Sequence, residues 1–243
     1  MGPGRAGESF RQALVGQGWH CVGIISRNDS PADAARGADV VLVTVPDDTI
    51  ASVAAAIAPA DAVLIHTSGA KTLDVLAPHD RTGSVHPLIS LPGATVGSER
   101  LLAGATFAVA GHPTATDIVA ALGGHPIAVP DELRATYHAA ASVAANHLVA
   151  ICGQVERLAS KAGVPAAAYW EMMALTLENV RASGAKPALT GPASRGDLET
   201  IAAHLQAIGE PEEDLYLTLA DAAAALAGQD TPISQQLPGR NAH

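Results

Sequence analysis

The sequence predicts an α/β domain followed by an all-α domain, and two observations lead to this prediction. As far as Pro130, short β-branched runs alternate with helical segments, which is typical of a sheet covered by helices on both faces. After Pro130 the strand pattern stops and long alanine-rich helical segments follow. We therefore expect an α/β domain over residues 1–130, a helical domain over 131–227 and a disordered tail over 228–243, where Pro, Gln and Gly are frequent.

Continuous apolar runs in the first domain predict buried strands at Cys21–Ser26, Val40–Val45 and Ala62–His66. Runs without polar alternation suit parallel strands that are covered on both faces. Helices are expected over Glu8–Gln17 and over Thr49–Ala58. Shorter helix and strand signals follow at Thr72–Leu76, Gly83–His86, Thr106–Ala110, Ile118–Leu122 and Ile127–Val129.

The first seven residues spell the pattern G-x-G-x-x-G. Between a strand and a helix, this pattern binds the pyrophosphate of a dinucleotide. Gly2 would allow the tight turn, Gly4 the close approach of the phosphates, and Gly7 the packing of the following helix on the sheet. Arg5 and Ala6 belong to the same turn and are expected to contact the cofactor. The pattern alone is weak evidence, because glycine-rich N-termini are often flexible leaders.

Two strands of a complete dinucleotide-binding sheet are missing from the pattern. Only Met1 precedes the glycine turn, so either the natural chain starts further upstream or the domain lacks its first strand. The segment between Arg27 and Asp39 is too short for a further helix and strand, which need about ten and about five residues. We therefore expect a sheet without its first strand and shortened after its second.

Ser26 and Arg27 lie roughly twenty residues after the glycine turn, where an acidic residue would bind the ribose 2′-hydroxyl of NAD. A guanidinium beside a hydroxyl instead suits the 2′-phosphate of NADP, because guanidinium binds phosphate through two parallel hydrogen bonds. We expect NADP, with NAD as the alternative cofactor. An arginine in a solvent-exposed loop would give the same pattern.

Polar or turn-forming residues follow the next two predicted strands, where the carboxyl ends of parallel strands line the ligand crevice. We therefore expect contacts with the cofactor here. The residues are Val45, Pro46, His66, Thr67 and Ser68.

Three further residues are candidates for contact with the substrate. His86 follows a strand and is fixed by the rigid Pro87. Thr190 and Arg195 belong to a turn-rich loop before a helix whose first turn Asp197 would cap or charge. Because helix starts attract anions, this loop could clamp a carboxylate. It could equally be a structural turn in which Arg195 pairs with Asp197.

His138, Ser142 and Asn146 have the spacing i, i+4, i+8 on a predicted helix over residues 131–162 and so share one face. The surrounding helix is rich in alanine, and an unpaired buried polar group costs about 1 to 3 kcal/mol. This stripe therefore faces either a helix–helix seam or a substrate cleft. In a cleft, His138 would be the proton donor, because the ordinary imidazole pKa of about 6.5 suits transfer near neutrality. Asn146 would orient the substrate.

A net charge of −10 and a pI near 5.3 argue against nucleic acid or anionic membrane as partners. No apolar run reaches the roughly 18 to 20 residues of a membrane span, and no signal-peptide pattern is present. Cys21 and Cys152 are far apart and are interpreted as reduced thiols. We expect a cytoplasmic protein without a metal site that acts on a small molecule.

Together these motifs resemble a group of bacterial oxidoreductases that pairs a Rossmann-like NADP-binding domain with a helical domain known as domain of unknown function 2520. The resemblance extends to about Ala227. The motifs that carry it are His66–Ala70, Ser84–Leu88, Leu102–Ala105, Tyr137–Ala141, Ala145–Leu148, Leu189–Pro192 and Arg195–Asp197. More distantly, the layout is similar to that of 3-hydroxyacid dehydrogenases and of ketopantoate, prephenate and pyrroline-5-carboxylate oxidoreductases.

The resemblance implies hydride transfer between NADP and a small oxo or imino acid, with a ketopantoate-type 2-oxo acid as the first guess. It also implies a homodimer formed through the helical domain. In 3-hydroxyacid dehydrogenases a catalytic lysine precedes an asparagine by one helical turn. Asn146 matches that asparagine, but Ser142 stands at the lysine position, so His138 becomes the candidate acid. The alternative is a non-catalytic nucleotide-binding or scaffolding protein with a degenerate sheet.

Overall fold

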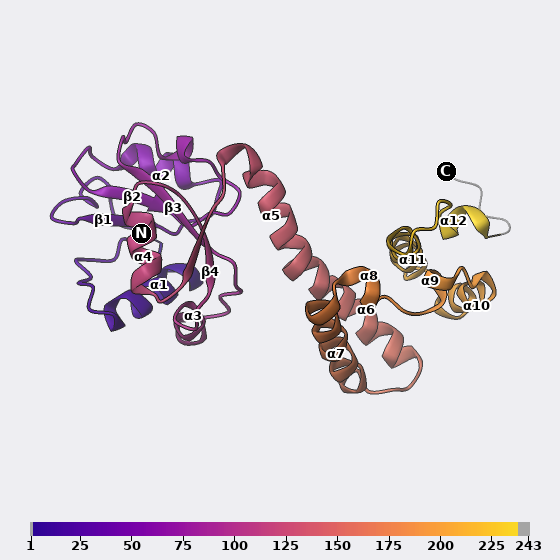
Figure 1. Cartoon of the computed structure of the whole chain (residues 1–243). Helices are drawn as coiled ribbons and strands as arrows, with labels where there is room; N and C mark the ends of the chain where they lie inside the picture. The colour runs from indigo at the N-terminus through magenta and orange to yellow at the C-terminus, as the bar shows by residue number, and fades with distance from the viewer. Residues whose placement is uncertain (1, 238–243) are drawn as a thin grey trace. The chain divides into compact units, whose positions relative to one another are not determined.

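The computed structural model describes residues 2–237, which form two compact units (Figure 1). The first unit extends to His147 and contains a five-stranded sheet, and the second begins at Leu148 and is helical in its described part. This confirms the predicted class, an α/β sheet with an all-α portion after it. The first unit extends beyond residue 130, where we expected the boundary, because the next helix is attached to the sheet.

The sheet has the strand order β1-β2-β3-β4-β5. The pairs β1–β2, β2–β3 and β4–β5 are parallel, whereas β3 and β4 are antiparallel, which the sequence did not predict. The carboxyl ends of the first three strands therefore meet at one edge. The strands are β1 (Val40–Val43), β2 (Val63–His66), β3 (Thr82–Pro87), β4 (Thr106–Gly111) and β5 (His125–Ala128).

Both faces of the sheet are covered, as the continuous apolar runs predicted. Within β2, Val63 and Ile65 join a core with α1, α3 and α4, whereas Leu64 joins a second core with α2 and η1. The helical elements of this unit are α1 (Arg5–Gly16), α2 (Ile50–Ala56), η1 (Leu73–Leu76), α3 (Ala94–Leu101), α4 (Thr114–Ala121), η2 (Asp131–Leu133), α5 (Arg134–Ser142) and η3 (Val143–His147).

The segment Cys21–Ser26 is not a strand, so this prediction is wrong. A strand needs a neighbour with which to form a ladder, and β1 is the edge of the described sheet. The N–H of Gly2 donates to the carbonyl of Ile25 at 2.9 Å, but no ladder follows. As predicted, the segment between Arg27 and Asp39 contains turns and neither a helix nor a strand.

The single helix predicted over residues 131–162 is interrupted. Between α5 and α6 (Leu148–Lys161) the chain forms the π-helical segment η3. A π-helix has i→i+5 hydrogen bonds and a wider turn than an α-helix. The i+4 relation that we expected between Ser142 and Asn146 therefore does not have regular α-helical geometry.

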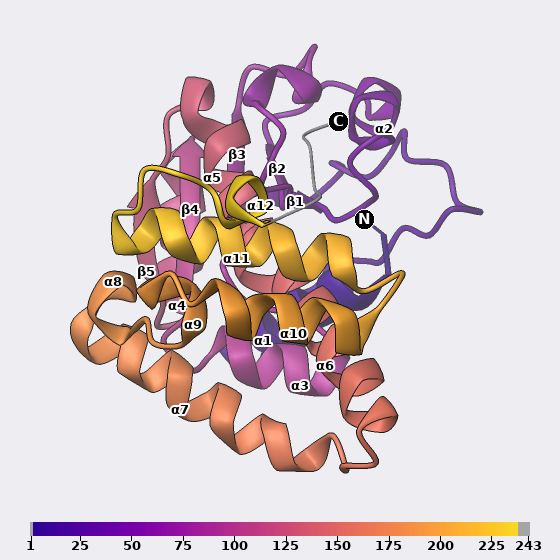
Figure 2. The ribbon, with the colours of Figure 1, turned by 90° about the vertical axis from the view of Figure 1, so that its right-hand side faces the viewer.

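The second unit is built from helices, and α10 and α11 lie side by side in Figure 2. Asp197 caps α10 as predicted, because its carboxylate accepts a hydrogen bond from the N–H of Thr200 at 3.1 Å. No helix among residues 2–237 has the length and apolar character that a bilayer span requires. The helices after α6 are α7 (Ala167–Ser183), α8 (Ala185–Ala188), α9 (Pro192–Arg195), α10 (Leu198–Ile208), α11 (Glu213–Ala227) and α12 (Ile233–Gln236).

The tail predicted as disordered over 228–243 is ordered in its described part. Ile233 is fully buried and belongs to a core with Leu237 and Ile201. The hydroxyl of Ser234 donates to the carboxylate of Asp221 at 2.6 Å. The burial of Ile233 and Leu237 thus orders a segment whose Pro- and Gln-rich composition predicted disorder. Residues 238–243 lie outside the described residues.

Candidate functional site

The three glycines of the first turn differ in the space around them. Gly2 has a φ of +85°, and a Cβ there would lie 2.7 Å from the carbonyl oxygen of Thr44. A Cβ on Gly7 would collide with the carbonyl oxygen of Gly2, which accepts a hydrogen bond from the Thr44 hydroxyl at 2.9 Å. Gly4 has no heavy atom within 4 Å of the Cβ position. The turn is therefore tight at its first glycine, packed at its third and open at its second.

This arrangement fits a dinucleotide pyrophosphate. Gly4 is the N-cap of α1, and the first N–H groups of a helix have no partner within it. The N–H groups of Arg5, Ala6 and Gly7 can therefore bind an anion, which the helix dipole also favours. The open space at Gly4 is where a phosphate would approach the backbone.

The loop after the Cys21–Ser26 segment contains a carboxylate that the sequence reading missed. Asp29 accepts hydrogen bonds from the Ser26 hydroxyl at 2.7 Å and the Ser26 N–H at 2.8 Å, and both lower the pKa of Asp29. The Ser26 hydroxyl, expected to bind a phosphate, donates to this carboxylate instead. Arg27 is exposed and has no hydrogen bond or ion pair with another described residue. The S-x-x-D spacing could have indicated this turn.

The loops that follow β1 and β2 are joined by a hydrogen bond from the Ser68 hydroxyl to the carboxylate of Asp47 at 2.7 Å. The same hydroxyl accepts hydrogen bonds from the N–H groups of Ala70 and Lys71. Thr44, which contacts the glycine turn, is separated from Asp47 only by Val45 and Pro46. A continuous set of contacts therefore connects the glycine turn with the loop that contains Thr67 and Ser68.

His66 does not line this edge, which corrects its predicted role in contacting the cofactor. Its side chain is fully buried on the face of the sheet that α2 and η1 cover. Its Nδ1 accepts a hydrogen bond from the N–H of Ser68 at 3.2 Å, and its Nε2 makes no hydrogen bond with a described residue. Burial, together with the nearby Arg134 guanidinium, lowers the pKa of His66 to about 4. His66 therefore shapes the loop as a neutral group.

Arg134, in the first turn of α5, is fully buried. Its guanidinium donates to the hydroxyl of Ser84, to the carbonyl of Ser68 at 3.4 Å and to the carboxylate of Asp131 at 3.2 Å. Because a buried charge must be paired or hydrogen-bonded, these contacts fix the start of α5 against the middle of β3 and the loop that follows β2. Sequence reasoning missed Arg134, since nothing local distinguishes it from a surface arginine.

Two histidines that the sequence singled out for different roles meet over Gly69. The ring centroids of His86 and His138 are 6.0 Å apart in an edge-to-face arrangement. A Cβ on Gly69 would lie 2.7 Å from Cε1 of His86 and 2.8 Å from Cδ2 of His138. The Nδ1 of His86 is 2.7 Å from the hydroxyl of Tyr137, a residue that the sequence reading did not select. Its spacing from Arg134, i to i+3, places both on one face of α5.

The electrostatics of this cluster favour a neutral His86 and a protonated Tyr137 near pH 7. Burial, followed by His138 and Arg134, lowers the pKa of His86 to about 4, against the opposing effect of Asp47. Burial raises the pKa of Tyr137, and Arg134 opposes that shift. A neutral imidazole is thus hydrogen-bonded to a protonated phenol. Such a pair can transfer a proton without creating a buried charged imidazole.

Two family models match the chain. Residues 24–92 match a Rossmann-like domain, and residues 105–223, just under half of the chain, match domain of unknown function 2520 (DUF2520). The chain thus pairs a Rossmann-like domain with a DUF2520 domain. His86 lies in the first match, whereas Arg134, Tyr137 and His138 lie in the second. No curated protein matches the sequence.

Solved structures share the fold. A protein from Thermotoga maritima is 26% identical, with 78% of each chain covered and a TM-score of 0.66. A candidate NADP oxidoreductase from Bacteroides fragilis has a TM-score of 0.80 at 20% identity and covers 92% of this chain and 96% of its own. Pyrroline carboxylate reductase from Plasmodium falciparum with NADP bound has a TM-score of 0.57 at 14% identity, covering 94% and 97%.

Four predicted site residues are not brought to the histidine cluster by any described contact. Ser142 is half-buried and Asn146 is exposed in the π-helical segment. Thr190 and Arg195 are exposed in the second unit. Asp197 caps α10 and forms no ion pair with Arg195 among the described residues. Their predicted roles stay predictions.

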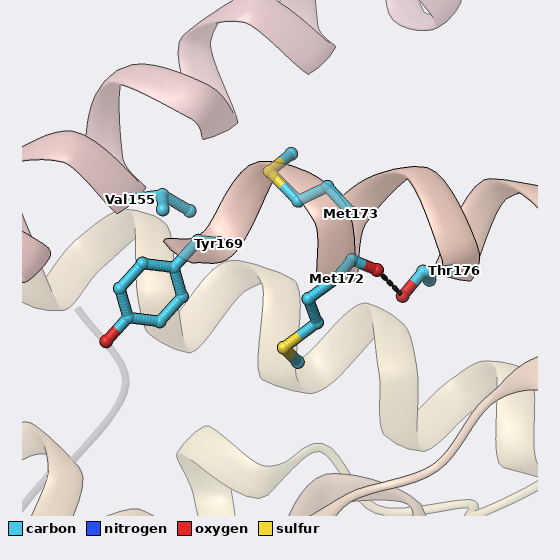
Figure 3. Close-up of a pocket in the computed structure, with 5 residues that line it drawn as sticks. All are labelled: Val155, Tyr169, Met172, Met173 and Thr176. Atoms are coloured by element: carbon cyan, nitrogen blue, oxygen red, sulfur yellow. Dashed lines mark hydrogen bonds between the residues drawn. The ribbon is translucent and has the colours of Figure 1, made fainter. Parts of the chain in front are cut away.

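A separate apolar hollow of about 180 Å³ lies between α6 and α7 of the DUF2520 domain (Figure 3). It is lined by no His, Asp, Glu, Lys or Arg side chain. No group of three or more His, Cys, Asp or Glu residues suited to a metal ion occurs among residues 2–237. The residues that line the hollow are Val155, Tyr169, Met172, Met173 and Thr176.

Proposed function

We propose that this protein is an NADP-dependent oxidoreductase that transfers hydride to a small oxo or imino acid. The glycine turn carries the proposal, because it is packed at Gly2 and Gly7 and open at Gly4, as pyrophosphate binding requires. The fold shared with a candidate NADP oxidoreductase and with a pyrroline carboxylate reductase supports it. A ketopantoate-type 2-oxo acid is the first substrate to test.

The chain's own residues divide into binding and proton-transfer groups. The first N–H groups of α1 would hold the pyrophosphate, and Arg27, which has no partner among the described residues, would bind the 2′-phosphate. The loops around Pro46 and Thr67 would contact the nicotinamide half. When bound, the nicotinamide supplies the hydride, so the protein must supply the proton. The His86 and His138 cluster, at the carboxyl ends of the strands, contains the groups suited to this task.

The substrate's acid group needs a positively charged or amide partner. Asn146 and Arg195 are proposed to orient it, with Ser142 and Thr190 as further hydroxyl contacts. These side chains make no competing hydrogen bond with another described residue. These four roles rest on the sequence, and substitution of each residue tests them.

The decisive experiment compares Gly4→Ala with Gly16→Ala in fluorescence titrations with NADPH and NADH. Both positions have open space around the Cβ and neither has a positive φ, so both variants should fold. We expect tighter binding of NADPH than of NADH by the wild type, at least a tenfold loss for Gly4→Ala, and no change for Gly16→Ala. Equal NADPH binding by the two variants would place the pyrophosphate elsewhere and overturn the proposal.

Turnover is tested by following NADPH oxidation with a panel of 2-oxo acids and cyclic imino acids. Oxidation by any member supports an oxidoreductase. NADPH binding without oxidation would favour the second candidate, a non-catalytic nucleotide-binding protein. The observation that favours this candidate is the absence of a strand at Cys21–Ser26, which leaves β1 at the edge of the described sheet.

We also propose that a second copy of the chain packs on α7. The second unit buries none of the residues of this 17-residue helix. An apolar helix without buried residues normally belongs to an interface. Its exposed apolar side chains are Trp170, Met172, Leu175 and Leu177.

A further inference from the structure

We propose that Tyr137 is the acid of this site and that neutral His86 passes its proton to the substrate. The inference rests on the function proposed above and names the group that supplies the proton. His138, the donor suggested by the sequence, would instead form a wall beside the imidazole of His86.

The geometry of the Tyr137–His86 pair supports a relay. The hydroxyl of Tyr137 lies 2.7 Å from Nδ1 of His86, and the two rings meet edge-on with centroids 5.6 Å apart. This bond occupies Nδ1 and leaves Nε2 for another partner. A side chain at Gly69 would block Nε2, because a Cβ there would lie 2.8 Å from that nitrogen.

His138 lacks the corresponding connection. Its ring contacts the edge of His86, but it makes no hydrogen bond with another described residue. No described residue therefore fixes its tautomer or replaces its proton by a hydrogen bond. Tyr137 is connected to His86 through Nδ1, so its hydroxyl can replace the proton that the imidazole gives to the substrate.

Burial and the groups around the pair decide which species is present. Burial, followed by His138 and Arg134, lowers the pKa of His86 to about 4, whereas Asp47 opposes this shift, so the ring is neutral at pH 7. A neutral imidazole that accepts at Nδ1 carries its proton on Nε2. The Arg134 guanidinium also opposes the burial that raises the pKa of Tyr137, so it stabilises a phenolate when one forms.

The proton transfer balances without a charged imidazole. A bound reduced nicotinamide would supply hydride to the substrate carbon. The C=O π electrons would move onto oxygen, which would take the proton from Nε2 of His86. At the same time Nδ1 takes the phenol proton, and Tyr137 becomes a phenolate. As Nε2 then takes a proton from solvent, the Nδ1 proton returns to the Tyr137 phenolate, so the imidazole stays neutral. Overall, the substrate carbon would be reduced and the bound nicotinamide oxidised.

The chain provides a matched control pair in its second unit. The hydroxyl of Tyr216 lies 2.7 Å from Nδ1 of His204, with ring centroids 5.8 Å apart and planes at 88°. The His86 and Tyr137 rings meet at 89°. Tyr137→Phe and Tyr216→Phe therefore remove the same hydroxyl from pairs of the same geometry.

Histidine side-chain ¹⁵N–¹H NMR on the full chain tests the starting state without cofactor or substrate. At pH 7 we expect His86 to be neutral with its proton on Nε2. Tyr137→Phe should shift the Nδ1 resonance and mix the tautomers, whereas Tyr216→Phe should leave His86 unchanged. A proton on Nδ1 of His86, or a charged ring at pH 7, would overturn the relay because the phenol could not donate.

Steady-state kinetics test the proton transfer, with the 2-oxo or imino acid of the panel that is reduced fastest as the substrate. We expect Tyr137→Phe to lower kcat about 100-fold, the lower end of general-acid effects, with NADPH affinity unchanged. Tyr216→Phe should retain kcat, and wild-type kcat should fall at high pH as Tyr137 loses its proton. A Tyr137→Phe enzyme with normal kcat, alongside an inactive His138→Ala enzyme, would assign the proton to His138. If NADPH does not bind, the proposed function fails, whereas the NMR result still decides the tautomer on which the relay depends.

Discussion

At the scale of single residues, the protonation of His66 should contribute to the pH dependence of stability, together with that of His86. Its pKa is about 4 in the folded protein and about 6.5 in an unfolded chain. Between these values the unfolded state binds more protons, so the free energy of unfolding falls as pH falls from 6.5 to 4 and is fully retained above 6.5. For His66 the loss between pH 7 and pH 5 is on the order of 2 kcal/mol.

Urea unfolding at pH 7 and pH 5 measures this effect. We expect His66→Asn, which keeps an acceptor near Nδ1 but cannot titrate, to lose part of the pH dependence of the wild type. The control variant His20→Asn, at an exposed position, should retain the full pH dependence of the wild type. Identical pH dependence in wild type and His66→Asn would show that His66 is not a neutral buried group in the folded protein.

The site residues differ in how far the sequence could reveal them. His86 stands out because it follows a predicted strand. His138 stands out because it interrupts an alanine-rich predicted helix. Arg134 and Tyr137 do not, because their importance arises from burial and from contacts with residues about fifty positions away. His66 was expected to contact the cofactor, although its spacing of two residues from Leu64 could have predicted that both side chains are buried on the same face of the sheet.

At the scale of elements, the close approach of α1 and α3 depends on one glycine. A Cβ on Gly97 would collide with the hydroxyl of Ser9, which is fully buried and donates to the carbonyl of Arg5 at 2.7 Å. Gly97→Ala should therefore destabilise the first unit by about 1–3 kcal/mol, as overpacking does. Gly93, the N-cap of α3, has open space and an extended backbone, so Gly93→Ala is the control. Thermal unfolding that is equal for both variants would contradict this packing.

Local patterns predicted most helices and strands, because the spacing of apolar residues reflects which side chains are buried on the two faces of the sheet. These predictions were wrong where contact with another segment of the chain decides the structure. Cys21–Ser26 has the composition of a strand but no ladder, and Ile233 orders a segment whose composition suggests disorder. The π-helical segment Val143–His147 was missed, because a template of 3.6 residues per turn cannot indicate a wider turn.

At the scale of the whole molecule, the exposed apolar side chains of α7 need a partner. Met172 is 66% exposed and lines the hollow between α6 and α7 (Figure 3). If a second copy covers this helix, a carboxylate placed there would have to be buried without a counter-ion, at a cost that disfavours association. Met172→Asp should therefore convert a dimer into a monomer.

Sedimentation velocity over a range of protein concentrations measures this change, with Val22→Asp as the control. Val22 is 60% exposed and belongs to the first unit, so a new carboxylate there should leave the dimer intact. NADPH affinity should be the same in both variants, because the proposed nucleotide-binding residues belong to the first unit and Met172 to the second. A monomeric wild type would contradict the proposed dimer, and the exposed apolar side chains of α7 would then need a different partner. Loss of NADPH binding only in Met172→Asp would show instead that the two units depend on each other for cofactor binding.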